Sequence, residues 1–214
     1  MRFLCISDIH GHAAALDAVL AEAKHWGYDQ LVVCGDLCFP GPRPLDVWKR
    51  LVDNNALCVQ GLTDRALAEL DPEDLHPESA LEQERLERLL STHRELGDLI
   101  LARLKRLPKT ARLPLESGHE MVVVHGSPAD PTIALTHDMT DDEVLALIGT
   151  DPCDLVICGG DHVPFQRQVE DVRIVGVGSV GEAPGNAVAY ATLVTSTGTQ
   201  TSVEQKEVPL AEPE

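Results

Sequence analysis

The chain has 214 residues and a net charge of −18, with 43% apolar and 24% charged residues. This length supports one compact domain with its own core, and ordinary numbers of Gly and Pro exclude a collagen-like or low-complexity chain. The acidic excess argues against a nucleic-acid backbone or an anionic membrane as partner, because both would be repelled. An anionic substrate would need local positive charge, and Lys and Arg are scarce, so we expect a bound metal ion.

The compartment is indicated by apolar patterning and cysteine usage. No stretch approaches the roughly 20 apolar residues of a membrane span, and Asp8 comes too early for a signal peptide. The six cysteines lie in or beside apolar runs without a C-x-x-C pair, which is typical of buried, reduced thiols. We therefore expect a cytoplasmic protein without a membrane partner.

The first 70 residues alternate short apolar runs with helical patterns. Strands are predicted at 2–7, 31–34 and 56–60, and helices at 13–23, 45–52 and 64–70. This alternation predicts a parallel sheet with helices on its faces.

The second half has a different pattern. Leu residues at helical spacing predict one or two amphipathic helices over 77–107, with a break near Gly97. The apolar stripe of these helices could form a contact in a homo-oligomer. Strands are predicted at 120–124, 155–158, 167–170, 172–175, 187–194 and 199–204, with a hairpin tip at 170–171. This more antiparallel pattern predicts a second sheet packed on the first. Residues 1–205 would then form one domain, and residues 206–214 a frayed tail.

Four apolar strands run directly into side chains that bind metals. These side chains are Asp8 and His10, Asp36, His125, and Asp161 and His162. Because ligands gather at the carboxyl ends of strands in open α/β sheets, we expect them to converge. Asp8 and His10 are two apart on an extended chain, so they point to the same side and can hold one ion. Mixed carboxylate and imidazole ligands suit Mn, Fe or Zn.

Each of these pieces alone is weak evidence. An Asp or His after a strand often serves a turn or a helix cap, which leaves an unrelated α/β domain open. Their joint order is much more specific: Asp-x-His, Gly-Asp, Gly-x-x-Asp, His-Gly, then a second His.

That order resembles the calcineurin-like metallophosphoesterase family, in its small prokaryotic form, over nearly the whole chain. The segments that match its motifs are 7–12, 34–37, 125–128 and 177–181. The resemblance implies a four-layer αββα sandwich, in which two facing mixed β-sheets are flanked by helices.

The resemblance also implies two metal sites of unequal quality. In the family, one ion is held by residues that match Asp8, His10, Asp36 and His162, and all four are present. The match of Asp36 bridges to a second ion, whose other ligands are the match of His125, an Asn and a further His. Changes in residues that hydrogen-bond to the ligands typically lower metal affinity by about 10–100-fold, and the loss of direct ligands should lower it further. We therefore expect one tight site and a second that is weak or empty.

The two missing ligands are at Leu62 and Gly160, which stand where the family has the Asn and the His. Neither side chain can coordinate a metal. Asp161, His12 or Cys38 could rescue the second site if correctly placed.

The Gly-x-x-Asp motif ends with Thr63 and Asp64. Many relatives have a proton-donating His where this chain has Thr63. Threonine is a poor acid, so we expect Thr63 to be a helix N-cap or a weak hydrogen-bond donor.

The implied activity is hydrolysis of a small phosphate mono- or diester by a metal-bound hydroxide. His125 and Asp36 are the implied catalytic residues, with His125 donating a hydrogen bond or a proton to the phosphate. Activity should be reduced, because half of the two-metal clamp is missing. The alternative is a catalytically impaired homologue that binds a phosphorylated ligand or a partner.

Overall fold

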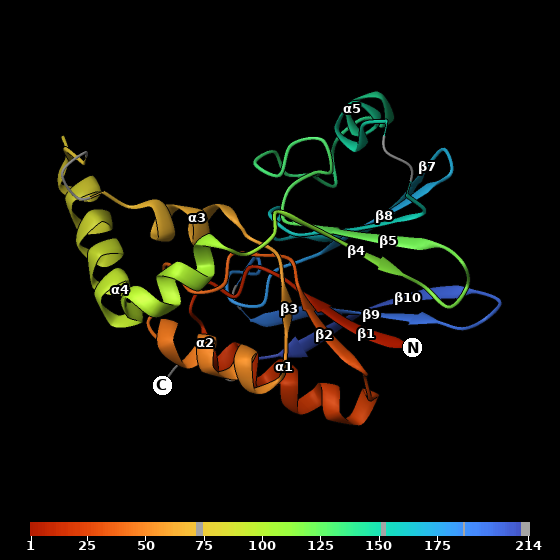
Figure 1. Ribbon diagram of the computed structural model, residues 1–214, viewed down its shortest axis with the longest axis horizontal. Helices are drawn as coiled ribbons and strands as arrows, with labels where there is room; N and C mark the ends of the chain where they lie inside the picture. Colours follow the sequence, from red (N-terminus) through yellow and green to blue (C-terminus); the bar gives the residue numbers. More distant parts are fainter. Residues whose placement is uncertain (72–74, 151–152, 186, 211–214) are drawn as a thin grey trace.

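A computed structural model describes residues 1–71, 75–150, 153–185 and 187–210, which form two facing five-stranded sheets with helices outside them (Figure 1). The first sheet has the order β10-β9-β1-β2-β3. Its strands are β1 (Arg2–Ile6), β2 (Gln30–Val33), β3 (Leu57–Cys58), β9 (Val188–Ser196) and β10 (Thr201–Pro209). β1, β2 and β3 are parallel, and β9 joins β1 in antiparallel pairing, so the end of the chain completes the sheet that the beginning starts.

The second sheet has the order β4-β5-β6-β8-β7. Its strands are β4 (Thr110–Pro114), β5 (Glu120–Val124), β6 (Leu155–Cys158), β7 (Pro164–Val169) and β8 (Val172–Val177). The three central strands are parallel, and the two edge strands are antiparallel to their neighbours. The predicted hairpin tip at 170–171 therefore joins β7 to β8.

Alternation along the buried strands explains the layers. In β1, Phe3 and Cys5 pack between the sheets, whereas Leu4 and Ile6 point outward to the helices. With both faces covered, the strand is apolar throughout, as parallel strands buried on two sides usually are.

In the described ranges, five helices lie outside the sheets. They are α1 (Ala13–Trp26), α2 (Pro44–Asp53), α3 (Leu62–Glu69), α4 (Ala80–Lys105) and α5 (Asp141–Ile148). α1 packs on the first sheet, and α5 packs on the second (Figure 1). None of the helices in the described part of the chain combines the length and apolar composition that a membrane span requires.

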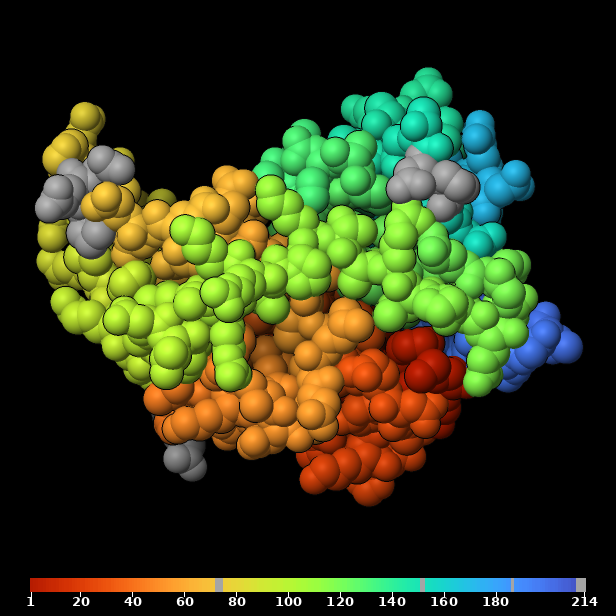
Figure 2. Space-filling model, in the orientation of Figure 1, coloured from red at the N-terminus to blue at the C-terminus, as the bar shows by residue number. Residues whose placement is uncertain are grey.

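The long helix α4 is bent at Gly97, where a φ of 71° interrupts the helical backbone. Its second segment packs on the core through Leu101 and Leu104, whereas the first segment extends to one side of the body (Figures 1 and 2). The predicted break near Gly97 is thus confirmed. This bend brings the first segment beside the loops that follow β1 and β2.

The facing-sheet architecture is confirmed, and so is the more antiparallel second half: β4 with β5, β7 with β8, and β9 with β10 pair antiparallel, whereas β6 pairs parallel with β5 and β8. Three details are corrected. The edge strand β4 and the short helix α5 were not predicted from the sequence, because neither carries a long periodic pattern. The expected tail is wrong for residues 206–209, which extend β10 and pair with β9 as far as Pro209. Residues 211–214 lie outside the described part.

Val208 on β10 gives a direct test of this correction. Its side chain is buried in the first core, so Val208→Ala should lower the free energy of unfolding by about 2 kcal/mol. Ser202→Ala, at an exposed position of the same strand, should change it by less than about 0.5 kcal/mol. Urea denaturation measures both, and equal stability of the two variants would contradict the docking of residues 206–209.

Candidate metal centre

The metal-binding side chains predicted from four separate strands meet at one end of the two sheets. Asp8 and His10 follow β1, Asp36 follows β2, His125 follows β5 directly, and His162 follows β6. They form two overlapping groups, Asp8–His10–His162 and Asp8–Asp36–His125, in which the ligand atoms lie within 4.8 Å of one another. The expected convergence is therefore present.

The first group has the spacing of ligands around one ion. His162 Nε2 lies 3.2 Å from both His10 Nε2 and Asp8 Oδ1. His10 Nε2 lies 3.7 Å from Asp8 Oδ1 and 3.9 Å from Asp36 Oδ2. Atoms bound at about 2.1 Å to one ion are separated by roughly 3–4 Å, so Asp8, His10 and His162 fit a shared cation, with Asp36 beside His10.

The orientation of the three imidazoles is set by main-chain carbonyls. Nδ1 of His10, His125 and His162 donates to the carbonyl oxygens of Phe39 at 2.6 Å, Cys34 at 2.9 Å and Glu182 at 3.2 Å, respectively. A carbonyl can only accept, so each Nδ1 carries the proton and each Nε2 faces the cluster. Such a bond is the usual support of a metal-binding histidine.

One buried oxygen has no partner unless a cation is bound. Asp8 Oδ1 is fully buried and has no hydrogen bond within the described ranges of the chain, while Asp8 Oδ2 accepts from the Gly160 amide at 3.0 Å. The neighbouring His10 and His162 present nitrogen lone pairs to each other at 3.2 Å, which is repulsive without a proton or a metal between them. The residues therefore fit a divalent cation.

The backbone that carries these ligands is strained. Asp8, His10, Asp36 and His162 all have positive φ values, between 50° and 61°. Non-glycine residues seldom adopt this left-handed region, which costs about 1–3 kcal/mol per residue and is retained mainly at functional sites. The left-handed backbone turns these four side chains toward one another. The residue types alone do not predict this backbone conformation.

Two glycines allow the loops to approach so closely. A Cβ atom at Gly61 would overlap Asp36 Oδ1, and one at Gly159 would overlap Ser7 Oγ. The metal-binding loops are in contact at these points, so only glycine fits.

Asp64 fixes the Asp36 loop and is not a ligand. Its carboxylate accepts from the amides of Asp36 and Gly61 at 2.9 Å and of Leu37 at 3.0 Å. Burial, reinforced by the charge of Asp36, raises the pKa of Asp64 to about 6.

Thr63 supports Asp36 from inside helix α3. Its amide donates to Asp36 Oδ1 at 2.8 Å. The expectation that Thr63 caps the helix is wrong, because the N-cap is Gly61, and Thr63 lies two residues into the helix. Its hydroxyl has no hydrogen-bond partner in the described segments.

The electrostatics of the cluster favour positive charge at its centre. Burial lowers the pKa of His125, but the nearby charges of Asp36 and Asp8 outweigh it and raise the pKa overall. The adjacent carboxylate of Asp8 raises the pKa of His162. Burial opposes ionisation of Asp8, yet its histidine neighbours lower the pKa of that carboxyl.

Of the two positions that lack family ligands, Gly160 lies beside the Asp8–Asp36–His125 group. Leu62 is 42% exposed at the start of α3. A Cβ atom built at Gly160 would lie 3.6 Å from His125 Nε2 and 3.2 Å from Ala134 Cβ, so a longer side chain there would reach the Asp8–Asp36–His125 group. Among the described residues, the two groups share Asp8, and the second group adds Asp36 and His125 to it.

The possible rescue residues lie elsewhere. Asp161 binds His137, accepting from its ring Nδ1 at 2.9 Å and its amide at 3.1 Å. Cys38 is buried in the core, and burial raises the pKa of its thiol well above the usual value. His12 is half-buried, and burial lowers its pKa. In the described part of the chain, none of the three joins a ligand group.

Glu182 is the site residue that sequence reasoning missed. Its Oε2 lies 3.7 Å from His10 Nε2, and its carbonyl oxygen accepts from His162. Its amide donates to Ser179 Oγ at 2.7 Å, and that hydroxyl donates to the Asp8 carbonyl at 2.8 Å. The signal was available, since Glu182 directly follows the 177–181 segment that matches a family motif.

The family model of the calcineurin-like phosphoesterase superfamily domain matches residues 1–198. The chain belongs to this superfamily. A curated relative, the uncharacterized protein MJ0912 of Methanocaldococcus jannaschii, is 26% identical over 177 residues, covering 82% of this chain and 68% of the relative. Membership indicates metal-dependent phosphoester hydrolysis as the class of chemistry.

Solved structures agree with the fold. The hypothetical protein PH1004 of Pyrococcus horikoshii OT3 superposes with a TM-score of 0.81 at 23% identity. A metallophosphoesterase of Sphaerobacter thermophilus superposes with a TM-score of 0.80 at 22% identity. In both cases the match covers 99% of this chain and 89% of the other. The αββα sandwich implied by the motifs is thereby confirmed.

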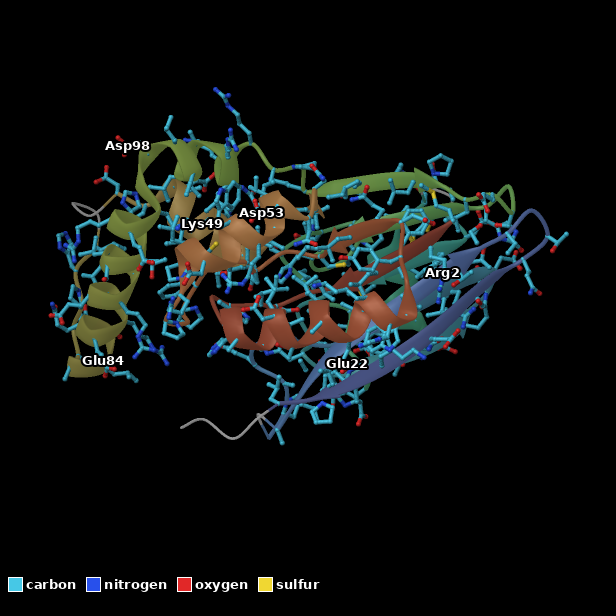
Figure 3. The ribbon with its side chains drawn as sticks, turned by 90° about the horizontal axis from the view of Figure 1, so that it is seen from below. Arg2, Glu22, Lys49, Asp53, Glu84 and Asp98 are labelled. Carbon is cyan, nitrogen blue, oxygen red and sulfur yellow. The ribbon has the colours of Figure 1, made fainter. Side chains whose placement is uncertain are left out.

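The role of Asp64 can be tested by an isosteric change. Asp64→Asn would place an amide donor against backbone amides, so we expect a loss of roughly 2–4 kcal/mol in unfolding free energy and weaker Mn²⁺ binding through a displaced Asp36. Asp98→Asn, at an exposed carboxylate on α4 (Figure 3), should change neither quantity. Denaturation and calorimetric titration of Mn²⁺ measure the two effects; unchanged stability of Asp64→Asn would show that this carboxylate does not hold the loop.

Proposed function

We propose that this chain hydrolyses small phosphate mono- or diesters with one tightly held divalent metal ion, Mn, Fe or Zn. The observation that carries the proposal is the buried, unpartnered Asp8 Oδ1 within 4 Å of two imidazole Nε2 atoms. A divalent cation suits a carboxylate and two lone pairs at once. The cytoplasm remains our proposed location for the protein.

The metal would be held by Asp8, His10, Asp36 and His162. When bound, such an ion lowers the pKa of a coordinated water and offers positive charge to phosphoryl oxygens. The protein residues orient these groups: the Phe39 and Glu182 carbonyls fix the two imidazoles, and the Thr63 amide fixes Asp36.

His125 is the proposed hydrogen-bond or proton donor to the phosphate. Its Nδ1 is fixed by the Cys34 carbonyl, and its Nε2 lies 3.5 Å from Asp36 Oδ2, at the edge of the ligand cluster. Among the described residues, the second ligand group consists of Asp8, Asp36 and His125, and the proposed tight ion would use both of these carboxylates, so we propose that the second site is weak or empty and the activity reduced.

A second candidate is a catalytically impaired homologue that binds a phosphorylated ligand or a partner. Leu62 and Gly160 favour it, because both remove ligands from the same ion. Thr63 also lacks the acidity of the histidine that many relatives have there. Metal-dependent hydrolysis at an ordinary enzymatic rate would exclude this candidate.

The activity is tested with Mn²⁺-loaded protein and generic phosphomono- and diesters. We expect turnover that falls at least about 100-fold in His10→Ala, since this change removes a ligand of the tight ion. His25→Ala, at an exposed histidine in the last turn of α1, should retain the wild-type rate. Equal rates for wild type and His10→Ala would reject the enzyme and leave the impaired homologue.

The one-ion stoichiometry is tested by restoring the missing ligands. We expect about one tightly bound Mn²⁺ per chain in the wild type and about two in Leu62→Asn with Gly160→His, with faster hydrolysis if the missing clamp limits the rate. Because Gly160 has a φ of 79°, the matched control is Leu62→Ala with Gly160→Ala, which carries the same backbone strain without new ligands. Elemental analysis after gel filtration counts the ions; two ions in the wild type would contradict the account.

A further inference from the structure

A cavity of about 340 Å³ adjoins the metal cluster. It is lined by the first segment of α4, by residues 40–42 and Pro44 before α2, by His12 and by Glu182. Figure 3 shows α4, with Glu84 and Asp98 labelled on it, at the end of the molecule away from the sheets. The bend at Gly97 is what places this helix segment against the metal-binding loops.

The cavity and the cluster share a boundary. Glu182 lines the cavity, and its Oε2 lies 3.7 Å from His10 Nε2. His12, two residues after His10, lines the same wall. A phosphate group on the cluster would therefore have room for its ester substituent in this direction.

One hydroxyl in the wall makes no hydrogen bond to the protein. Thr92 on α4 is 4% exposed as a residue and lines the cavity, and its hydroxyl has no hydrogen bond to any described residue. A hydroxyl can both donate and accept one hydrogen bond. Thr92 thus offers a free donor and acceptor to a polar group of a ligand inside the cavity.

The charge of the wall restricts what that ligand can be. Glu95 and Glu182 both line the cavity. The cationic side chain in its lining, Arg88, already donates to Glu84 at 3.0 Å. The wall is therefore acidic, which favours hydroxyl and ammonium donors and repels a second anion.

We propose that this cavity binds the alcohol part of the substrate, and that this part carries hydroxyl or amino groups and no further negative charge. The Thr92 hydroxyl and the Glu95 carboxylate are its specificity-determining groups. The substrate class is then a phosphate ester of a polyol or an amino alcohol. The inference rests on the proposed function, because the metal cluster must bind the phosphate.

Three phosphate esters on one three-carbon skeleton separate these effects. Glycerol 2-phosphate carries two hydroxyls, isopropyl phosphate has none, and 2-phosphoglycerate replaces one hydroxymethyl group by a carboxylate. We expect kcat/KM of the Mn²⁺-loaded protein to be highest for glycerol 2-phosphate. The test compares how each ratio of kcat/KM values changes from the wild type to a variant. A contact of the substrate carboxylate with the metal affects wild type and variant equally, so it does not contribute to this change.

Each variant should change one ratio. Thr92→Val should reduce the preference for glycerol 2-phosphate over isopropyl phosphate by about 5–10-fold. Glu95→Gln should reduce the discrimination against 2-phosphoglycerate by about 3–10-fold, less at high salt. Glu87→Gln, an exposed change on the same helix outside the cavity lining, should alter neither ratio.

A structural role for Thr92 gives a different pattern. Since its hydroxyl is unpaired, Thr92→Val should melt at the same or a higher temperature than the wild type. A lower melting temperature with unchanged ratios would overturn the proposal, as would ratios that neither variant changes.

A binding experiment distinguishes failure of the proposed enzymatic function from failure of the proposed specificity. If no ester is hydrolysed, calorimetric titration of the same three esters into the Mn²⁺-loaded protein gives Kd ratios, for which the same changes are expected. Absence of hydrolysis with the expected Kd ratios would reject the enzyme but retain the binding specificity. Equal Kd values for all three esters in the wild type would reject the specificity.

Discussion

The site depends on the mutual approach of groups that repel one another unless a cation lies between them. Asp8, Asp36, His10 and His162 bring carboxylate oxygens and imidazole nitrogens to 3.2–3.9 Å, largely out of water. The charge is not relieved by arginine or lysine, because no such side chain pairs with these ligands in the described part of the chain. A divalent ion offsets both the desolvation and the repulsion, which explains why an acidic protein would recognise an anionic phosphate.

The rest of the fold holds these ligands in place. Two sheets packed face to face bring strand ends from distant parts of the sequence to one edge, and left-handed residues turn the side chains inward. The hydrogen bonds of Asp64 to three amides compensate part of that strain by fixing the Asp36 loop. Stability and metal binding are therefore coupled through the same buried carboxylate.

The sequence predicted the convergence of the candidate ligands because each follows a strongly apolar strand, and strand ends of a parallel sheet meet. It failed where the determinant is tertiary. The C-terminal strand β10 has an ordinary polar pattern and is fixed by pairing with β9 and by the burial of Val208, so the sequence alone predicts a tail at residues 206–209. Glu182 reaches the cluster through a loop whose course depends on hydrogen bonds to Ser179 and Asp8. The pairing of Asp161 with His137 involves a loop that carries no periodic signal.

The central claim is that one cation site is intact and its neighbour is depleted. Anomalous diffraction at the manganese edge, from crystals grown with Mn²⁺ at low concentration, tests it most directly. The account predicts one strong peak within bonding distance of Asp8, His10, Asp36 and His162, and little or no density beside His125 away from that peak. Two peaks of equal height, or a single peak at His125 and not at His10, would contradict it.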